Sequence, residues 1–457
     1  MSLDPDDQRV IDLIKAAGRP PIYTLSPPLA REAYRLSRAP FQPELPEVEE
    51  VREFAAQGSG GEIPLRYYRG KGAVREQCPV LVFYHGGGYV IGDRDTHDYV
   101  CRKLANATQC AVVSVDYRLA PEHKFPAAVD DSAAALRWVV DHADILRIDR
   151  HRVAVGGDSA GGNLAANMAH MARNGDVPKI VFQLLFYPGT DMRMTQSSYK
   201  RDFSNFPLST EACRYFLGHY LRGEKDKTDW RASPLLAPSF TGLAPALVLT
   251  AGYDPVADEG IAYAKRLDES GVPVTAIHMS DQMHGFLTMG KIVRAADTAL
   301  EMSATALRRI FTISKSAPYR EKQLEPRLRQ LRPQTERKIV MSDKINEQAE
   351  KMRAIAQSTL DKAKDAVSKY MAESQKMREK TDSSVRASYS TAKDMNEKAV
   401  AFAEANVNAG FELAQRLLQA KNPQEMGAIY QSHLKEQMEK MNAQFRELGS
   451  AMTKSLK

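Results

Sequence analysis

Ser159 stands in the hexapeptide Gly157–Gly162, which contains the pattern Gly-x-Ser-x-Gly. The apolar run 152–156 before it predicts a buried strand, and the helix-forming residues 163–169 after it predict a helix. A strand, a tight glycine-flanked turn and a helix lift a serine hydroxyl above a sheet edge, and side chains in place of the glycines would obstruct the helix behind. The pattern therefore marks Ser159 as a candidate nucleophile.

A serine hydroxyl is a weak nucleophile at neutral pH and needs a base within hydrogen-bond reach. Two strand-like runs follow downstream, at 246–250 and 274–279. Asp254 comes shortly after the first run and His284 shortly after the second. Since the carboxyl ends of parallel strands meet at one sheet edge, we expect Ser159, Asp254 and His284 to converge there. His284 would take the serine proton and return it to the leaving alcohol, while Asp254 would orient the imidazole and stabilise its charged form.

Four other titratable residues lie near these positions, and the sequence favours structural roles for them: His278, Asp258, Glu259 and Asp281. His278 falls inside a predicted strand. Asp258 and Glu259 fit the first turn of a helix, where carboxylates suit the helix dipole. Asp281 shares the predicted loop of His284 and is the weaker candidate for the acid.

An oxyanion that forms during ester cleavage needs backbone N–H groups aimed at it. Three consecutive glycines directly follow the strand-like run 80–84, so the chain there can approach a substrate closely. We expect the N–H groups of Gly87, Gly88 and Ala160 to be the donors. Asp158 is expected to fix this loop by hydrogen bonding and to take no part in the chemistry.

Strands alternate with helices through residues 51–315, which predicts an α/β fold with a parallel sheet covered on both faces. The expected strands are 80–84, 111–117, 152–156, 180–187, 246–250 and 274–279. The expected helices are 99–108, 127–142, 163–169, 259–270 and 295–311. Residues 1–50 have a helical, proline-punctuated pattern, with an apolar stripe at 10–14 and a second short helix at 30–36.

Composition limits the class of protein. A chain of 457 residues favours roughly two or three domains, and no run of about 18 apolar residues predicts a membrane span. The acidic N-terminus has no signal-peptide pattern, and none of the four cysteines lies in a Cys-x-x-Cys pair. These features predict a cytoplasmic protein without a metal centre or a cofactor.

The formal net charge of +6 does not favour a nucleic-acid partner, because it is concentrated in one segment. Residues 314–340 contain eight Lys or Arg and three Asp or Glu, a balance of +5. Such a segment is typical of a solvated tether, and we assign residues 316–340 as a basic linker.

The remaining residues, 341–457, have a helical composition, with neither glycine nor proline before Gly410. One apolar stripe recurs there at steps of three and four: Tyr430, Leu434, Met438, Met441, Phe445, Leu448 and Met452. The stripe fits a helix that lies on an apolar surface, and it equally fits an oligomerising coiled coil. Its alanines and methionines favour the surface-binding interpretation.

Residues 1–313 resemble the hormone-sensitive-lipase family of α/β-hydrolases, in its bacterial esterase branch. The resemblance is carried by five motifs in order: His85–Tyr89 with Gly92-Asp93, Asp116–Glu122, Gly157–Gly162, Asp254-Pro255 with Asp258–Gly260, and His284–Phe286. It implies hydrolysis of short-chain carboxylesters without a metal, by the triad and oxyanion residues assigned above. It also implies that His85 and Gly86 support the glycine loop, and that residues 1–50 form a helical cap over the acyl pocket. Val256-Ala257 departs from the Leu-Arg that the family often has.

Residues 341–457 resemble phasins, the proteins that coat polyhydroxyalkanoate granules in bacteria, most clearly around Ala420–Glu425. The resemblance implies recruitment of a serine carboxylesterase to a granule surface. Two alternatives stay open. The chain is a granule-coating or oligomerising structural protein whose hydrolase part is incidental, or Met341 is a start of translation and the two parts are joined by read-through.

Overall fold

The computed structural model describes residues 2–316 and the isolated positions 416, 432 and 436. Residues 2–316 lie within one compact unit, Met1–Glu321. The predicted basic linker, from residue 317 onward, and the predicted helical region 341–457 lie outside the described residues, apart from those three positions.

One eight-stranded sheet organises the described chain, with the strand order β1-β2-β4-β3-β5-β6-β7-β8. The strands are β1 Glu50–Gly58, β2 Gly61–Arg69, β3 Cys78–Tyr84, β4 Ala111–Val115, β5 Ile148–Asp158, β6 Phe182–Phe186, β7 Ala246–Tyr253 and β8 Val274–Met283. The six strands from β4 to β8 in this order are parallel, as predicted. The sheet is mixed at one edge, where a tight turn joins β1 to β2 and β2 runs antiparallel to both of its neighbours, so the predicted parallel arrangement does not extend to these two strands.

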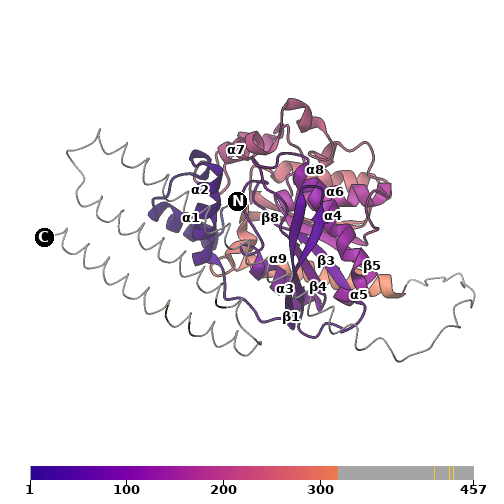
Figure 1. Ribbon diagram of the computed structural model, residues 1–457. Helices are drawn as coiled ribbons and strands as arrows, with labels where there is room; N and C mark the ends of the chain where they lie inside the picture. The colour runs from indigo at the N-terminus through magenta and orange to yellow at the C-terminus, as the bar shows by residue number, and fades with distance from the viewer. Residues whose placement is uncertain (1, 317–415, 417–431, 433–435, 437–457) are drawn as a thin grey trace, which may run out of the picture. The chain divides into compact units, whose positions relative to one another are not determined.

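Helices cover both faces of the sheet, as the alternating pattern predicted (Figure 1). The α-helices are α1 Pro5–Ala16, α2 Pro27–Arg38, α3 Asp98–Thr108, α4 Ala127–Asp141, α5 Ala143–Leu146, α6 Ala160–Asn174, α7 Thr210–Tyr220, α8 Ala257–Glu269 and α9 Ala295–Ser316. Alternate residues of β3 belong to different hydrophobic clusters. Val80 and Val82 belong to the cluster that includes residues of α4, α6 and α8, whereas Leu81 and Phe83 belong to the cluster that includes residues of α3 and α9.

The first 50 residues contain two helices, α1 and α2, as their sequence predicted. Asp4 caps α1 by accepting the Asp6 N–H at 2.7 Å, and Pro5 occupies the first helical position, where its missing N–H costs nothing. The helix ends at Ala16, shortly before Gly18, whose φ is +60°. Residues of both helices line the pocket described below.

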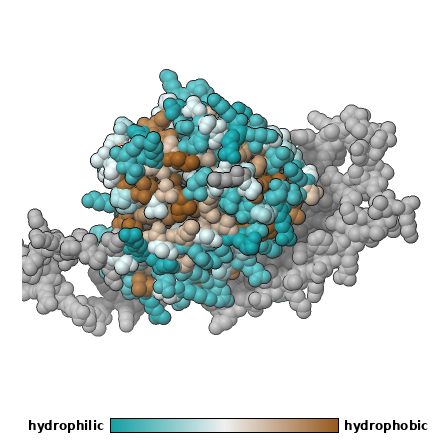
Figure 2. Space-filling model, turned by 180° about the vertical axis from the view of Figure 1, so that it is seen from behind, coloured by the Kyte–Doolittle hydropathy of each residue, from teal (hydrophilic) through white to brown (hydrophobic). Residues whose placement is uncertain are grey.

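The surface of the described residues mixes hydrophilic and hydrophobic patches when seen from behind (Figure 2). Several exposed large apolar side chains belong to the N-terminal segment: Leu13, Tyr23, Leu29, Leu36 and Leu45. Within the described part of the chain, no helix combines the length and the apolar character that crossing a bilayer requires.

Candidate active site

Ser159 occupies the turn between β5 and α6 in a backbone conformation that few residues other than glycine adopt, with φ +55° and ψ −117°. The two flanking glycines make this turn possible. A Cβ at Gly157 would lie 2.4 Å from the Tyr84 carbonyl oxygen, and a Cβ at Gly161 only 1.9 Å from the same atom. Close packing of β3 against the turn therefore requires glycine at both positions, and the hydroxyl is presented at the carboxyl edge of the sheet.

A continuous chain of hydrogen bonds joins the three residues that the sequence predicted to converge. The Ser159 Oγ lies 2.9 Å from His284 Nε2, and His284 Nδ1 lies 2.7 Å from Asp254 Oδ2. Asp254 is fully buried, and its other oxygen accepts the Val256 N–H at 2.9 Å. A carboxylate that binds Nδ1–H leaves Nε2 free to accept the hydroxyl proton, so the arrangement can activate the serine.

The strand ends explain this convergence. Asp254 directly follows β7 and His284 directly follows β8, and the His284 N–H donates to the Tyr253 carbonyl at 3.2 Å. The strand predicted at 274–279 in fact continues to Met283. The placement of Asp281 on the loop of His284 was therefore wrong: Asp281 lies inside β8, where its carbonyl accepts the Asp4 N–H.

The other titratable residues near the site bind elsewhere. His278 lies in β8, with its Nδ1 2.9 Å from the Thr250 hydroxyl. Asp258 and Glu259 lie in the first turn of α8, as predicted, but their side chains also hold other segments. Asp258 accepts hydrogen bonds from the residue pair 197–198. The buried Glu259 accepts the Thr190 N–H at 2.8 Å.

The glycine loop leaves backbone N–H groups available at the pocket. Among residues 2–316, the N–H groups of Gly87, Gly88 and Ala160 donate to no protein acceptor. All three residues line the same pocket as Ser159. The Gly86 N–H, by contrast, donates to Asp158 Oδ1 at 2.9 Å. The loop thus offers three free donors to an incoming oxygen and uses the fourth to hold itself in place.

Two buried histidines lie behind this loop. His85 stacks on Tyr117, with ring centroids 4.3 Å apart, and the Tyr117 hydroxyl donates to the His85 carbonyl at 2.7 Å. His97 Nε2 lies 3.2 Å from Asp158 Oδ1. Burial alone would raise the pKa of Asp158, but the charge of His97 and the hydrogen bonds from His97 and Gly86 lower it. Burial and the nearby His97 lower the pKa of His85.

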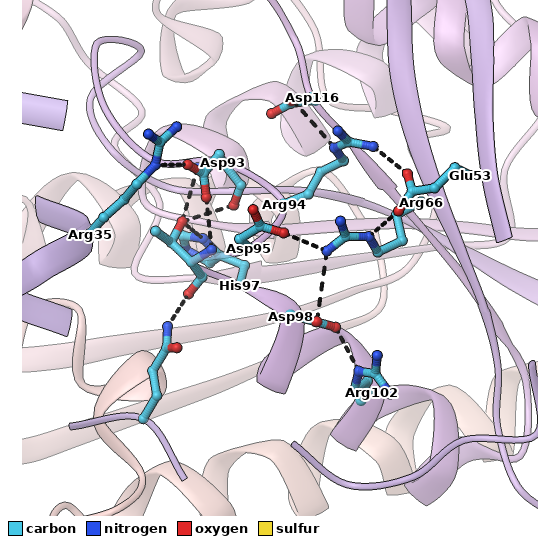
Figure 3. A network of polar contacts seen from close by, with 12 residues as sticks. Arg35, Glu53, Arg66, Asp93, Arg94, Asp95, His97, Asp98, Arg102 and Asp116 are labelled. Atoms are coloured by element: carbon cyan, nitrogen blue, oxygen red, sulfur yellow. Dashed lines mark hydrogen bonds and ion pairs between the residues drawn. The ribbon is translucent and has the colours of Figure 1, made fainter. Parts of the chain in front are cut away.

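One ion pair of the polar network in Figure 3 fastens α2 to the segment that follows the glycine loop. Arg35 of α2 binds the Asp93 carboxylate, which also accepts the Thr96 N–H at 2.8 Å. The Thr96 hydroxyl lies 3.0 Å from His97 Nδ1. The network therefore links α2 to His97, and through it to Asp158.

The pocket around Ser159 has a volume of about 400 Å³, which is within the range of small-molecule sites. Its walls are largely apolar, and the cap contributes Ile14, Tyr23, Leu25, Tyr34 and Phe41. Within residues 2–316, no group of three or more His, Cys, Asp or Glu side chains is arranged to hold a metal ion.

Sequence reasoning missed three polar residues around the site. His97 carries no local signal, because its partner Asp158 lies 61 residues away. Arg38 is the last residue of α2 and lines the pocket, although the sequence pattern of α2 is typical of a helix on the protein surface. Tyr187 packs its ring 4.7 Å from that of His284, and its hydroxyl has no hydrogen-bond partner in the described chain.

Comparison with protein families divides the chain into two matched parts. A family model described as α/β hydrolase fold matches residues 81–288, and one described as phasin protein matches residues 368–457.

Individual relatives of the N-terminal part are ester hydrolases. The carboxylic ester hydrolase LipN of Mycobacterium tuberculosis is 43% identical over 267 residues, which cover 57% of this chain and 70% of that protein. An ethyl acetate hydrolase of Pseudomonas putida is 36% identical over 318 residues, which cover 67% of this chain and 99% of that protein.

Solved structures give the same result. An ester hydrolase from the metagenome of Lake Arreo, complexed with a bipyridine phosphonate derivative, is 42% identical, with a TM-score of 0.66 over 68% of this chain and 99% of that chain. The hyperthermophilic esterase of the archaeon Pyrobaculum calidifontis is 36% identical, with a TM-score of 0.64 over the same shares.

Proposed function

Because the chain belongs to the α/β-hydrolase family that includes bacterial carboxylesterases, we propose that it cleaves esters with Ser159 as nucleophile, His284 as general base and Asp254 as the acid that orients it. The observation that carries this proposal is the unbroken hydrogen-bonded chain from the Ser159 hydroxyl to the buried Asp254 carboxylate. The three unengaged N–H groups of the neighbouring loop support it.

The reaction proceeds in two halves. His284 Nε2 takes the Ser159 proton as Oγ attacks the ester carbonyl carbon, and the resulting oxyanion accepts hydrogen bonds from the N–H groups of Gly87, Gly88 and Ala160. The intermediate collapses to an acyl-serine, and the imidazolium gives its proton to the departing alcohol. Water then attacks the acyl carbon, giving one proton to His284, which returns it to Ser159 as the free acid leaves.

We assign short-chain acyl esters as the substrates. The modest volume of the pocket supports this assignment, and so does the likeness to an ethyl acetate hydrolase. Phe216 limits the space directly beside the glycine loop, because a Cβ at Gly88 would lie 2.3 Å from its ring.

Ser159→Ala tests the assignment of the nucleophile. The variant should lose p-nitrophenyl butyrate hydrolysis by at least about a thousandfold and keep the wild-type circular dichroism spectrum. Ser270→Ala, at the end of α8 and outside the pocket, is the matched control and should stay close to wild type. Retention of more than about a tenth of wild-type activity by Ser159→Ala would show that another residue is the nucleophile.

For the C-terminal part, we propose that residues 341–457 recruit the esterase to polyhydroxyalkanoate granules. The phasin match supports this role. The alternatives are a coiled coil that makes the chain oligomeric, a coat protein with an incidental hydrolase, and a read-through product. Fluorescent fusions of residues 341–457 and of residues 1–315 in granule-forming cells separate recruitment from the coiled coil. Whether the native cell makes one full-length chain or separate hydrolase and helical products tests read-through. Rings around granules for the first fusion and diffuse signal for the second are expected, and diffuse signal for both would contradict recruitment.

A further inference from the structure

Arg38 is a buried cation in the wall of the active-site pocket. It is the last residue of α2, only 9% of its surface is exposed, and it lines the cavity that contains Ser159. Its guanidinium carbon lies 4.9 Å from the centre of the Tyr34 ring. Within residues 2–316 it forms no ion pair, and its Nε has no hydrogen-bond partner.

A buried charge without a counter-ion is costly, so its position calls for an anionic partner. The carboxyl groups of the pocket cannot provide it. Asp158 is engaged by His97 and by the Gly86 N–H. Glu259 is engaged by the Thr190 N–H, and burial raises the pKa of its carboxyl, which disfavours the charged form.

Two further cations strengthen the positive character of the pocket. Lys15 and Arg19 line its cap side, and both are exposed. Among the residues that the structure describes, neither forms an ion pair. A site lined by cations that lack carboxylate partners attracts negatively charged ligands over neutral ones.

The Arg38 guanidinium lies beside the turn that carries His284. A Cβ at Gly285 would be 3.6 Å from Arg38 Nη2. In the reaction proposed above, His284 gives its proton to the leaving alcohol. A group on the alcohol portion of the ester is therefore the part of the substrate that reaches Arg38.

We propose that Arg38 binds a carboxylate on the alcohol portion of the substrate, so that the preferred substrates are acyl esters of hydroxy acids with a free carboxyl group. This inference rests on the proposed function. Hydrolysis adds water across the ester bond and releases the acyl group as an acid and the alcohol portion as a hydroxy acid. Guanidinium geometry suits a carboxylate, which it can bind through two parallel hydrogen bonds.

The phasin match makes this substrate class chemically consistent with the whole chain. Cleavage of a polyester of hydroxy acids produces oligomers that end in a free carboxylate. The last ester bond of each oligomer carries that carboxylate on its alcohol side. An esterase near such a polymer therefore meets the combination of ester and carboxylate for which Arg38 is placed.

The test compares two substrates that differ in charge alone, 3-acetoxybutanoate and 3-acetoxybutanamide, with the full chain. Acetate release gives kcat/KM for each. The wild type should prefer the carboxylate, and Arg38→Met should lower the ratio of the two kcat/KM values by about 10- to 100-fold. Arg38→Lys should retain part of the preference. Arg9→Met removes an exposed cation of α1 that lies outside the pocket, and should leave the ratio unchanged.

A second measurement needs no variant. Against p-nitrophenyl butyrate, 3-hydroxybutanoate should inhibit the wild type at least about tenfold more tightly than 3-hydroxybutanamide. Equal inhibition, equal turnover of the two esters, or an unchanged ratio in Arg38→Met would each overturn the inference. If one of these results is found and Ser159-dependent cleavage of p-nitrophenyl butyrate persists, the proposed esterase function stands and only the role of Arg38 is refuted. If that cleavage is absent as well, both the proposed esterase function and the role of Arg38 are refuted.

Discussion

Replacing Asp7 with asparagine should remove a large part of the pH dependence of stability in the catalytic unit. Asp7 lies in α1 and is fully buried. One carboxylate oxygen accepts the Met283 N–H at 2.6 Å, and the other has no hydrogen-bond partner in the described chain. Burial raises the pKa of Asp7 to about 7, and the hydrogen bond from Met283 opposes that rise.

The sign of the effect follows from the two pKa values. In the unfolded chain the pKa of Asp7 is 3.8, so the folded state holds its proton more tightly. The contribution of Asp7 to the free energy of unfolding is therefore highest below pH 4, falls as the pH rises toward about 7, and is lost above it. The folded and unfolded pKa values of Asp7 differ by about 3, which corresponds to about 4 kcal/mol of unfolding free energy over the full pH range. About 3 kcal/mol of this is lost between pH 5 and pH 8.5.

Asparagine keeps an oxygen acceptor for the Met283 N–H and cannot ionise. As the pH is raised from 5 to 8.5, the unfolding free energy of Asp7→Asn should therefore increase by about 3 kcal/mol relative to that of the wild type. Urea unfolding followed by tryptophan fluorescence measures this, because both tryptophans, Trp138 and Trp230, lie among the described residues. Asp12→Asn, on the exposed surface of α1, removes the same charge and should follow the wild-type pH dependence. Parallel stability curves for Asp7→Asn and wild type would refute the argument.

Three further predictions concern the site. Asp254→Asn should lower kcat by roughly four orders of magnitude without unfolding the protein, because an amide holds the histidine in the wrong tautomer; steady-state kinetics and circular dichroism check this. Gly161→Ala should be insoluble or strongly destabilised, since its Cβ would lie 1.9 Å from the Tyr84 carbonyl oxygen, and a wild-type urea midpoint would contradict that reasoning. Glu259→Gln should remain within about 1 kcal/mol of wild type at pH 7, whereas Glu259→Ala, which leaves the Thr190 N–H without its acceptor, should cost about 1–3 kcal/mol in the same urea assay.

Features with a local physical cause were predictable from the sequence. The turn at Ser159 is specified by its own glycines and by the strand and helix on either side, so its shape follows from adjacent residues. Asp254 and His284 each follow a strand, and parallel strands bring such positions to one edge of the sheet. The hairpin of β1 and β2 was not among the expected strands. The antiparallel pairing of β2 with β4 joins segments that are far apart in the sequence, so no local pattern indicates it.

Charge, burial and partner choice around the pocket were decided only by the tertiary structure. Asp7 meets the Met283 N–H across 276 residues of sequence, and Arg38, from the N-terminal segment, lies beside Gly285 of the His284 turn. Both residues sit on helices whose patterns also fit an exposed surface. The pKa of a carboxyl and the ligand preference of a guanidinium depend on which groups exclude water around them. Those groups come from distant segments, so no stretch of sequence contains the information until the chain has folded.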